Sequence, residues 1–376
     1  MLIRDLRIKG YRCFEDFSMD GLTRVNLLVG NNNSGKTSFL EAVYLLVNQP
    51  SFSSKNLGKV IKEIFENRNE FSQHLESYEG ESTYVRKNYF IDRLFYEYGH
   101  NTVDKSSISS QYDHNVSIDI GNDIPFGGDY IYLWYSNDRY MLKMDEEKKR
   151  VLEIFFEFNA QGLISESARK LDESLSENYI EQKTFFHGEI QSSLFLSNYQ
   201  INLEKVSSLW DEIELTPKED IIIEALRIIL PTVERIGFSV SEGFNNIRLK
   251  VKDHPKPIPL SSMGYGMNRI LMLAMALVST EKGVLLVDEI ETGLHYEAQL
   301  DMWRLVLKTA QDLNVQVFAT THSWDCIAAF KEALQELEDQ SVAKLFRLDS
   351  KYGKLRAVEY DAEEIRIAVN QGVEVR

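Results

Sequence analysis

The sequence predicts an α/β fold with a mixed central sheet, an antiparallel β lobe and a helical insertion. Three observations lead to this prediction. Two short apolar segments, 25–29 and 284–287, each end in a polar turn, as buried strands of a parallel sheet do. Residues 88–160 alternate apolar and polar side chains in the manner of antiparallel strands. Amphipathic, helix-like spacing follows up to Leu230, where Pro231 ends it.

We expect three parts along the chain. They are an N-terminal lobe over 1–160, a helical insertion over 161–230 and a C-terminal lobe over 231–376. The insertion contains apolar residues with no chemical role, among them the run 194–196 and Trp210. They predict a contact with another subunit or an effector, and packing on the parent lobe is the alternative because aromatic residues usually belong to a core.

Composition and charge limit the possible functions. The 376 residues are 43% hydrophobic and 27% charged, as in ordinary globular proteins. No apolar run reaches the length of a membrane span, and the two cysteines, Cys13 and Cys326, are far apart, so we expect a cytoplasmic protein without disulfide or zinc. The net charge of −16 argues against unaided, tight DNA binding, although a local basic patch would still permit it.

The strongest motif lies directly after the first apolar strand. Residues 30–37 follow the pattern G-x-x-x-x-G-K-T, and a helix-like segment begins at Ser38. Glycines let backbone N–H groups surround phosphate oxygens, and a helix N-terminus adds partial positive charge. A chance match in a Gly/Asn turn is the alternative, and the flanking strand and helix patterns disfavour it. The candidate nucleotide-binding residues are Gly30, Asn31, Asn32, Asn33, Ser34, Gly35, Lys36, Thr37 and Ser38.

A second motif lies directly after the expected strand 284–287. Asp288 and Glu289 follow this apolar run directly. A strand of this kind delivers an aspartate to a magnesium ion, and the next carboxylate polarises the attacking water in phosphoryl transfer. A solvated acidic turn is the alternative. The pairing with a phosphate loop in the same chain favours hydrolysis.

A third motif precedes a strongly apolar helix at 270–278. Ser262 and Gly264 form a Ser-x-Gly turn at the expected helix N-terminus, which suits an anion. Since the chain already has a phosphate loop, this second site suggests the γ-phosphate of ATP on a partner subunit. The alternative is that Ser262 only caps the helix.

Taken together, these three motifs resemble the ABC-type ATPase head. Three further segments belong to the same resemblance: 8–14, 290–295 and 319–323. The variant is the one shared by SMC proteins, RecF and OLD-family nucleases, known as AAA-15 or AAA-21. The resemblance covers roughly residues 1–50 and 255–330. It is nearest to small bacterial OLD-like ATPases of antiviral defence loci.

The resemblance implies roles residue by residue. Lys36 contacts the β/γ phosphates, Thr37 and Asp288 hold Mg²⁺, and Glu289 is the general base. Ser262 and Gly264 contact ATP bound to the opposite protomer. His322 matches the switch histidine that senses the γ-phosphate, and Arg12 matches an arginine near the phosphates. The alternatives are that His322 caps a strand end and that Arg12 is a surface residue. Residues 291–295 match the D-loop.

Some features depart from the family pattern. The signature reads Ser-Met-Gly-Tyr-Gly, and no glutamine fits a Q-loop, so we expect 94–99 to replace it. No heptad repeat predicts a coiled-coil arm. The stretch 323–376 is too short for a Toprim nuclease, so we expect any nuclease on another polypeptide.

The sequence therefore predicts a homodimeric ATPase that uses ATP and Mg²⁺. We expect it to act as the sensor or scaffold of an antiviral defence system with a separate nuclease-like effector. One alternative is a RecF-like repair ATPase that acts directly on DNA. Another is an ATP-dependent assembly protein with negligible turnover.

Overall fold

The computed structural model describes most of the N-terminal 48 residues, nearly all of the chain after 209, and shorter pieces between. The described residues are 2–48, 60, 63–76, 84–89, 94, 105–110, 116–121, 130–135, 138–145, 150–156, 192–197, 209–241, 244–351 and 354–375. The chain forms two compact units. We call 1–2, 21–40 and 191–376 the core unit, and 3–20 and 41–190 the antiparallel unit.

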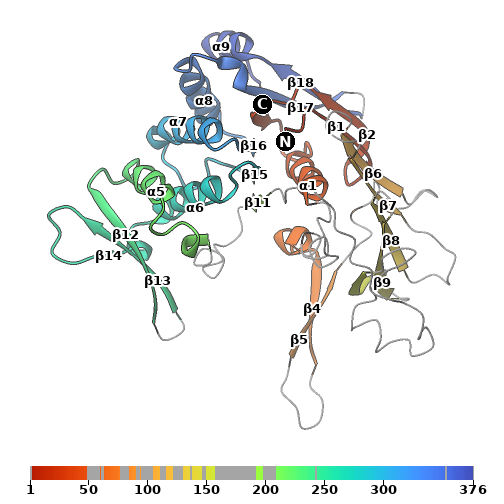
Figure 1. The fold of residues 1–376 in the computed structure, drawn as a ribbon. Helices are drawn as coiled ribbons and strands as arrows, with labels where there is room; N and C mark the ends of the chain where they lie inside the picture. The colour runs from red at the N-terminus through yellow and green to blue at the C-terminus, as the bar shows by residue number, and fades with distance from the viewer. Residues whose placement is uncertain are drawn as a thin grey trace. The chain divides into compact units, whose positions relative to one another are not determined.

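The core unit contains a six-stranded mixed sheet in the order β11-β15-β16-β3-β17-β18 (Figure 1). The first five strands are parallel, and β18 pairs antiparallel with β17. Side chains of β3, β15 and β16 are buried along their whole length, as expected for parallel strands covered on both faces. The strands are β3 (Val25–Val29), β11 (Ser193–Leu196), β15 (Val284–Val287), β16 (Gln316–Thr320), β17 (Ala343–Lys351) and β18 (Lys354–Tyr360).

Helices with apolar faces pack against this sheet and against one another. The α7–α8 pair is fixed by Trp303, whose ring meets Phe330 edge-on at 4.8 Å and whose Nε1 donates to the carbonyl of Cys326 at 3.1 Å. The helices are α1 (Lys36–Val47), α5 (Lys218–Arg227), α6 (Tyr265–Ser279), α7 (Tyr296–Asp312), α8 (Trp324–Gln335) and α9 (Ala362–Asn370), with short 3-10 turns η4 (Leu260–Ser262) and η5 (Gln340–Val342).

A small three-stranded sheet in the order β12-β13-β14 lies beside α5. Its strands are β12 (Val233–Ser241), β13 (Phe244–Val251) and β14 (Ile258–Pro259). Trp210 stacks on Phe238 of this sheet with ring centroids 4.5 Å apart, and only 1% of Trp210 is exposed.

The apolar residues for which we expected an outside contact are therefore largely enclosed. Residues 194–196 belong to β11, a strand of the central sheet, with Phe195 buried. A short apolar run cannot be assigned to strand or helix from its spacing alone, and here pairing with β15 makes it a strand. The burial of Phe195 and Trp210 removes the reason for predicting an effector contact there. Most of 161–208 lies outside the described residues.

The antiparallel unit contains a nine-stranded sheet in the order β2-β1-β6-β7-β8-β9-β10-β5-β4. Every neighbouring pair in it is antiparallel, which confirms the β layer predicted for 88–160. Its strands are β1 (Asp5–Tyr11), β2 (Phe14–Asp20), β4 (Phe71–Glu76), β5 (Tyr84–Tyr89), β6 (Lys105–Ser110), β7 (Val116–Gly121), β8 (Tyr130–Tyr135), β9 (Asp138–Asp145) and β10 (Arg150–Phe156).

The two units are not the parts that we expected from the sequence. Residues 21–40 join the C-terminal half because β3 pairs with both β16 and β17. A search of the described residues for a helix long and apolar enough to cross a bilayer finds none.

Candidate nucleotide site

The carboxyl ends of three neighbouring parallel strands bring the predicted site residues together. The glycine loop follows β3, Asp288 and Glu289 follow β15, and His322 comes two residues after β16. Ligand sites in open α/β sheets form at this edge because the loops after parallel strands meet there. Leu196 of β11 holds the backbone of this site, since its carbonyl accepts the Asp288 N–H at 2.8 Å.

The glycine loop has the backbone that its motif predicts. Gly30 has φ +148°, and a Cβ there would lie 2.5 Å from the Leu348 carbonyl oxygen and 2.7 Å from the Ser34 hydroxyl. Gly35 and Asn33 also have positive φ, at +88° and +65°. Glycine tolerates such conformations and asparagine does so more readily than most residues. α1 begins at Lys36, so its first N–H groups lie at the end of the loop.

Lys36 folds back over this loop. Its Nζ donates to the carbonyls of Gly30 at 2.7 Å and Asn31 at 2.9 Å. Burial lowers the pKa of Lys36, and the nearby carboxylates of Asp288, Glu289 and Glu291 oppose that shift. Burial is the larger effect, so the pKa of this ammonium lies below its ordinary value at the place where the motif expects phosphate.

Asp288 lies between two hydroxyl donors. Its Oδ2 accepts from Thr37 Oγ1 at 2.9 Å, and its Oδ1 accepts from Thr320 Oγ1 at 2.6 Å. The predicted magnesium ligands, Thr37 and Asp288, are thus in direct contact. One carboxylate and one hydroxyl, completed by phosphate and water, is a donor set that fits Mg²⁺. Within the described ranges, no group of three or more His, Cys, Asp or Glu could hold a metal on protein ligands alone.

Glu289 is held in an unusual backbone conformation. Its φ is +46°, a left-handed value that is uncommon for residues other than glycine, and its N–H donates to Thr320 Oγ1 at 2.8 Å. Its Oε2 accepts from Thr292 Oγ1 at 3.3 Å, and 38% of the side chain is exposed. Such strain persists only where surrounding contacts enforce it, and it is common at active sites.

Arg269 is a contributor that the sequence analysis did not single out. It lies on α6, only 6% exposed, and its Nη2 donates to the carbonyls of Asp288 at 2.9 Å and Glu289 at 3.0 Å. Burial lowers its pKa. The available signal was one arginine at the start of an otherwise apolar helix, because a buried arginine needs polar partners.

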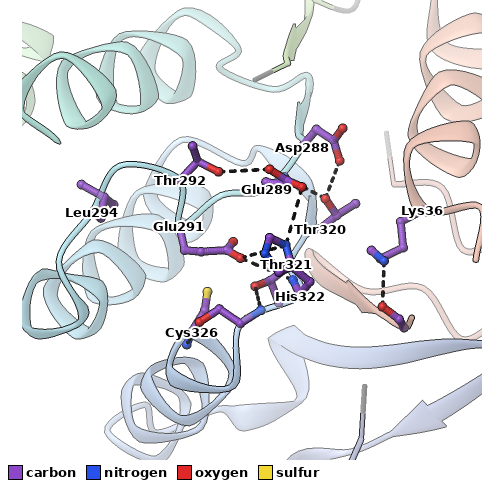
Figure 2. A network of polar contacts seen from close by, with 12 residues as sticks. Lys36, Asp288, Glu289, Glu291, Thr292, Leu294, Thr320, Thr321, His322 and Cys326 are labelled. Atoms are coloured by element: carbon purple, nitrogen blue, oxygen red, sulfur yellow. Dashed lines mark hydrogen bonds and ion pairs between the residues drawn. The ribbon is translucent and has the colours of Figure 1, made fainter. Parts of the chain in front are cut away.

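His322 lies beside two carboxylates (Figure 2). Its Nδ1 is 3.6 Å from Glu289 Oε1 and 3.6 Å from Glu291 Oε1, and 54% of its side chain is exposed. The predicted histidine and the predicted base are therefore neighbours. Glu291, which we had noted only as part of a D-loop match, is the second carboxylate beside this histidine.

The signature turn lies at the start of α6, in the same unit. Ser262 Oγ donates to the Pro259 carbonyl at 2.7 Å, and the N-cap of α6 is Gly264, with φ +82°. Ser262 is therefore not the cap of this helix. A Cβ on Gly264 would meet nothing within 4 Å, so the turn is open. Tyr265 lies against Gly293, where a Cβ would come within 2.0 Å of its ring.

Arg12 lies in the antiparallel unit, in a buried ionic cluster. Its Nε is 2.9 Å from Glu41 Oε2 and its Nη1 is 2.8 Å from Glu70 Oε2, while Glu41 also accepts from Arg68. Arg12 is thus not a surface residue, and its contact with nucleotide stays a prediction. Of the expected Q-loop replacement, 94–99, only Leu94 is among the described residues.

The fold and the site define an ABC/SMC-type ATPase of the RecF/OLD-like kind. The chain belongs to the AAA_15 family, the AAA ATPase domain, which matches residues 1–206 and 142–327. It is therefore an ATPase, as the motifs predicted.

Beyond this family model, the chain is also similar to individual proteins. The chain is 23% identical to the ATP/GTP phosphatase of Helicobacter pylori, over 92% of each chain. A shorter segment is 37% identical to the DNA replication and repair protein RecF of Francisella tularensis subsp. mediasiatica, over 21% of this chain and 22% of RecF. Among solved structures, the SMC head domain from Thermotoga maritima matches 96% of this chain and 100% of its own, with a TM-score of 0.43 and 12% identity.

Proposed function

We propose that two copies of this chain enclose two ATP molecules, and that this dimer is the sensor or scaffold of an antiviral defence system. The observation that carries the dimer is the signature turn. Ser262 is exposed and is not the helix cap, and Gly264 leaves the turn open. The chain has its own phosphate loop, so a second anion site is best used by the ATP of a partner copy.

Within one copy, the proposed chemistry follows the contacts described above. Lys36 contacts the β/γ phosphates, and the loop residues from Gly30 to Ser38 supply N–H groups. Thr37 and Asp288 would hold Mg²⁺, which would supply positive charge next to the phosphate oxygens. Glu289 accepts a proton from the attacking water, and His322 contacts the γ-phosphate. Most of the catalysis is positioning and charge stabilisation.

The dimer is tested by Ser262→Arg, which adds bulk and positive charge to the signature turn. We expect it to bind ATP as a monomer but to lose ATP-dependent dimerisation and hydrolysis. Analytical ultracentrifugation and phosphate release measure these two properties. Normal hydrolysis by Ser262→Arg would exclude the composite site.

Mixing two inactive variants makes the test sharper. Glu289→Gln disables the site in its own copy, whereas Ser262→Arg disables the site of its partner. Their mixed dimer therefore carries both lesions in one site and leaves the other intact, so ATPase activity should return. The matched control mixes Glu289→Gln with His322→Ala, which places one lesion in each site and should restore nothing.

The effector is proposed to be a separate nuclease-like protein. Affinity purification of the tagged ATPase from cells that contain its neighbouring genes tests this. Recovery of a nuclease in a nucleotide-dependent complex is the expected result. Recovery of the ATPase alone in the presence of ATP would contradict the effector.

A RecF-like repair ATPase is the second candidate, and the 37% identity with RecF over 78 residues favours it. DNA binding by the purified protein, with an affinity that falls steeply with salt, would support that candidate. The net charge of −16 weighs against it.

A further inference from the structure

Glu291 is a buried carboxylate whose hydrogen bonding is incomplete. Only 8% of it is exposed, and among the described residues no donor reaches its Oε2. Within the part of the chain that the structure describes, its Oε1 accepts the backbone N–H of His322, at 3.4 Å. A buried acceptor without a donor destabilises the folded state. Glu291 therefore destabilises the fold where it stands, which points to a function that needs its carboxylate as an acceptor.

The imidazole of His322 lies beside the other oxygen of this carboxylate, Oε1. Its Nδ1 is 3.6 Å from Glu291 Oε1 and 3.6 Å from Glu289 Oε1, beyond hydrogen-bond length in both directions (Figure 2). A neutral imidazole has one N–H, so it can donate from Nδ1 to only one of the two carboxylates at a time. A small rotation of the ring decides which one.

The choice between the two carboxylates matters for hydrolysis. A donor bonded to Glu289 stabilises its anion and occupies an oxygen that must accept a proton from water. A donor bonded to Glu291 leaves that oxygen available and fixes the ring through a buried, rigid partner. Carboxylates orient histidines in this way at many catalytic sites.

We propose that Glu291 is a positioning residue for hydrolysis: it accepts the Nδ1–H of His322, draws the ring from Glu289 and fixes the direction of Nε2. The proposal rests on the proposed roles of Glu289 and His322. Burial and backbone placement support it, because Glu291 lies three residues after Asp288 in a turn closed by the Leu294 N–H to Glu291 carbonyl bond of 2.9 Å. This placement therefore keeps the Glu291 carboxylate close to His322.

Two substitutions separate positioning from a structural role. Glu291→Met removes the acceptor and keeps the volume, and Glu291→Gln keeps a neutral acceptor. Replacement of an incompletely bonded buried carboxylate by an apolar side chain leaves stability unchanged or raises it. We therefore expect Tm to stay or rise, while kcat falls about tenfold or more for Met and less for Gln, with KM within about twofold.

A double-mutant cycle tests whether Glu291 acts through His322. In a His322→Ala background, Glu291→Met should cause no further loss of kcat, because its partner is already absent. The surface variant Glu332→Gln on α8, whose carboxylate is 55% exposed, is the control for loss of one negative charge and should keep wild-type kcat.

Two results would overturn the inference. One is full wild-type kcat in Glu291→Met. The other is a double variant in which the fold-loss of kcat equals the product of the losses caused by Glu291→Met and His322→Ala alone. If Glu291→Met does not fold, Glu291→Gln enters the same cycle and the same two outcomes apply. Glu289→Gln distinguishes this failure from failure of the proposed function: if Glu289→Gln keeps turnover, the base assignment itself is wrong.

Discussion

At the scale of single residues, backbone geometry marks the residues that carry chemistry. Gly30 and Glu289 have φ values of +148° and +46°; Gly30 directly follows the buried strand β3, and Glu289 is the second residue after the buried strand β15. A strand that ends in a strained residue aims the next side chains out of the sheet edge. The chain thus gives up local stability at the positions where phosphate and water are expected.

The first residue-scale prediction concerns hydrolysis. Glu289→Gln keeps the shape of the side chain and removes the base, so ATP should still bind while turnover falls by about 10²-fold or more. Lys36→Ala should instead lose ATP binding. Fluorescent-nucleotide titration and single-turnover hydrolysis measure the two effects, and wild-type hydrolysis by Glu289→Gln would contradict the assignment.

A second residue-scale prediction concerns the loop backbone. Gly30→Ala would place a methyl group 2.5 Å from the Leu348 carbonyl, so we expect loss of ATP binding and a destabilisation of about 1–3 kcal/mol. Gly237→Ala is the matched control, because a Cβ there meets nothing within 4 Å. Urea unfolding measures both. Equal stability of the two variants would show that the loop tolerates a side chain.

At the scale of elements, the segment before α5 packs through Trp210. Its ring stacks on Phe238 and is 1% exposed, so Trp210→Ala should destabilise the protein by about 3–5 kcal/mol. ATP turnover well below Tm should be unchanged, because the ring stacks on Phe238 of the small sheet and Phe238 is not a site residue. Thermal unfolding and an ATPase assay check this. Loss of a partner protein without loss of stability would instead revive the predicted effector contact.

The motifs that were predictable are local in sequence. The loop 30–37 and the pair Asp288–Glu289 each combine an apolar strand with its turn, so adjacent residues reveal them. Arg269 and Glu291 contact residues 20 and 31 positions away along the chain, and these contacts depend on how α6 and β16 pack. The strand β11 was missed for a related reason: four residues adopt it only because β15 lies alongside.

At the scale of the whole molecule, the proposed dimer predicts that assembly depends on nucleotide and on Mg²⁺. The signature turn and the phosphate loop both belong to the core unit, yet the proposal assigns them to different ATP molecules. Association should therefore depend on nucleotide, and chelation of Mg²⁺ with EDTA should return the protein to monomers. Light scattering with ATP, with and without EDTA, measures this in Glu289→Gln, which consumes ATP much more slowly than the wild type. A dimer that forms without ATP and persists in EDTA would contradict the proposed dimer with two enclosed ATP molecules.

The position of β3 in the central sheet has a consequence for synthesis on the ribosome. Its two neighbours are β16 and β17, which begin at Gln316 and Ala343, so the strand that carries the phosphate loop leaves the ribosome long before either partner exists. An apolar strand without partners is exposed to wrong pairing, and contacts of large sequence separation form slowly. The nascent chain should therefore be unable to bind ATP until almost all of it has been made, and it should depend on chaperones during that interval.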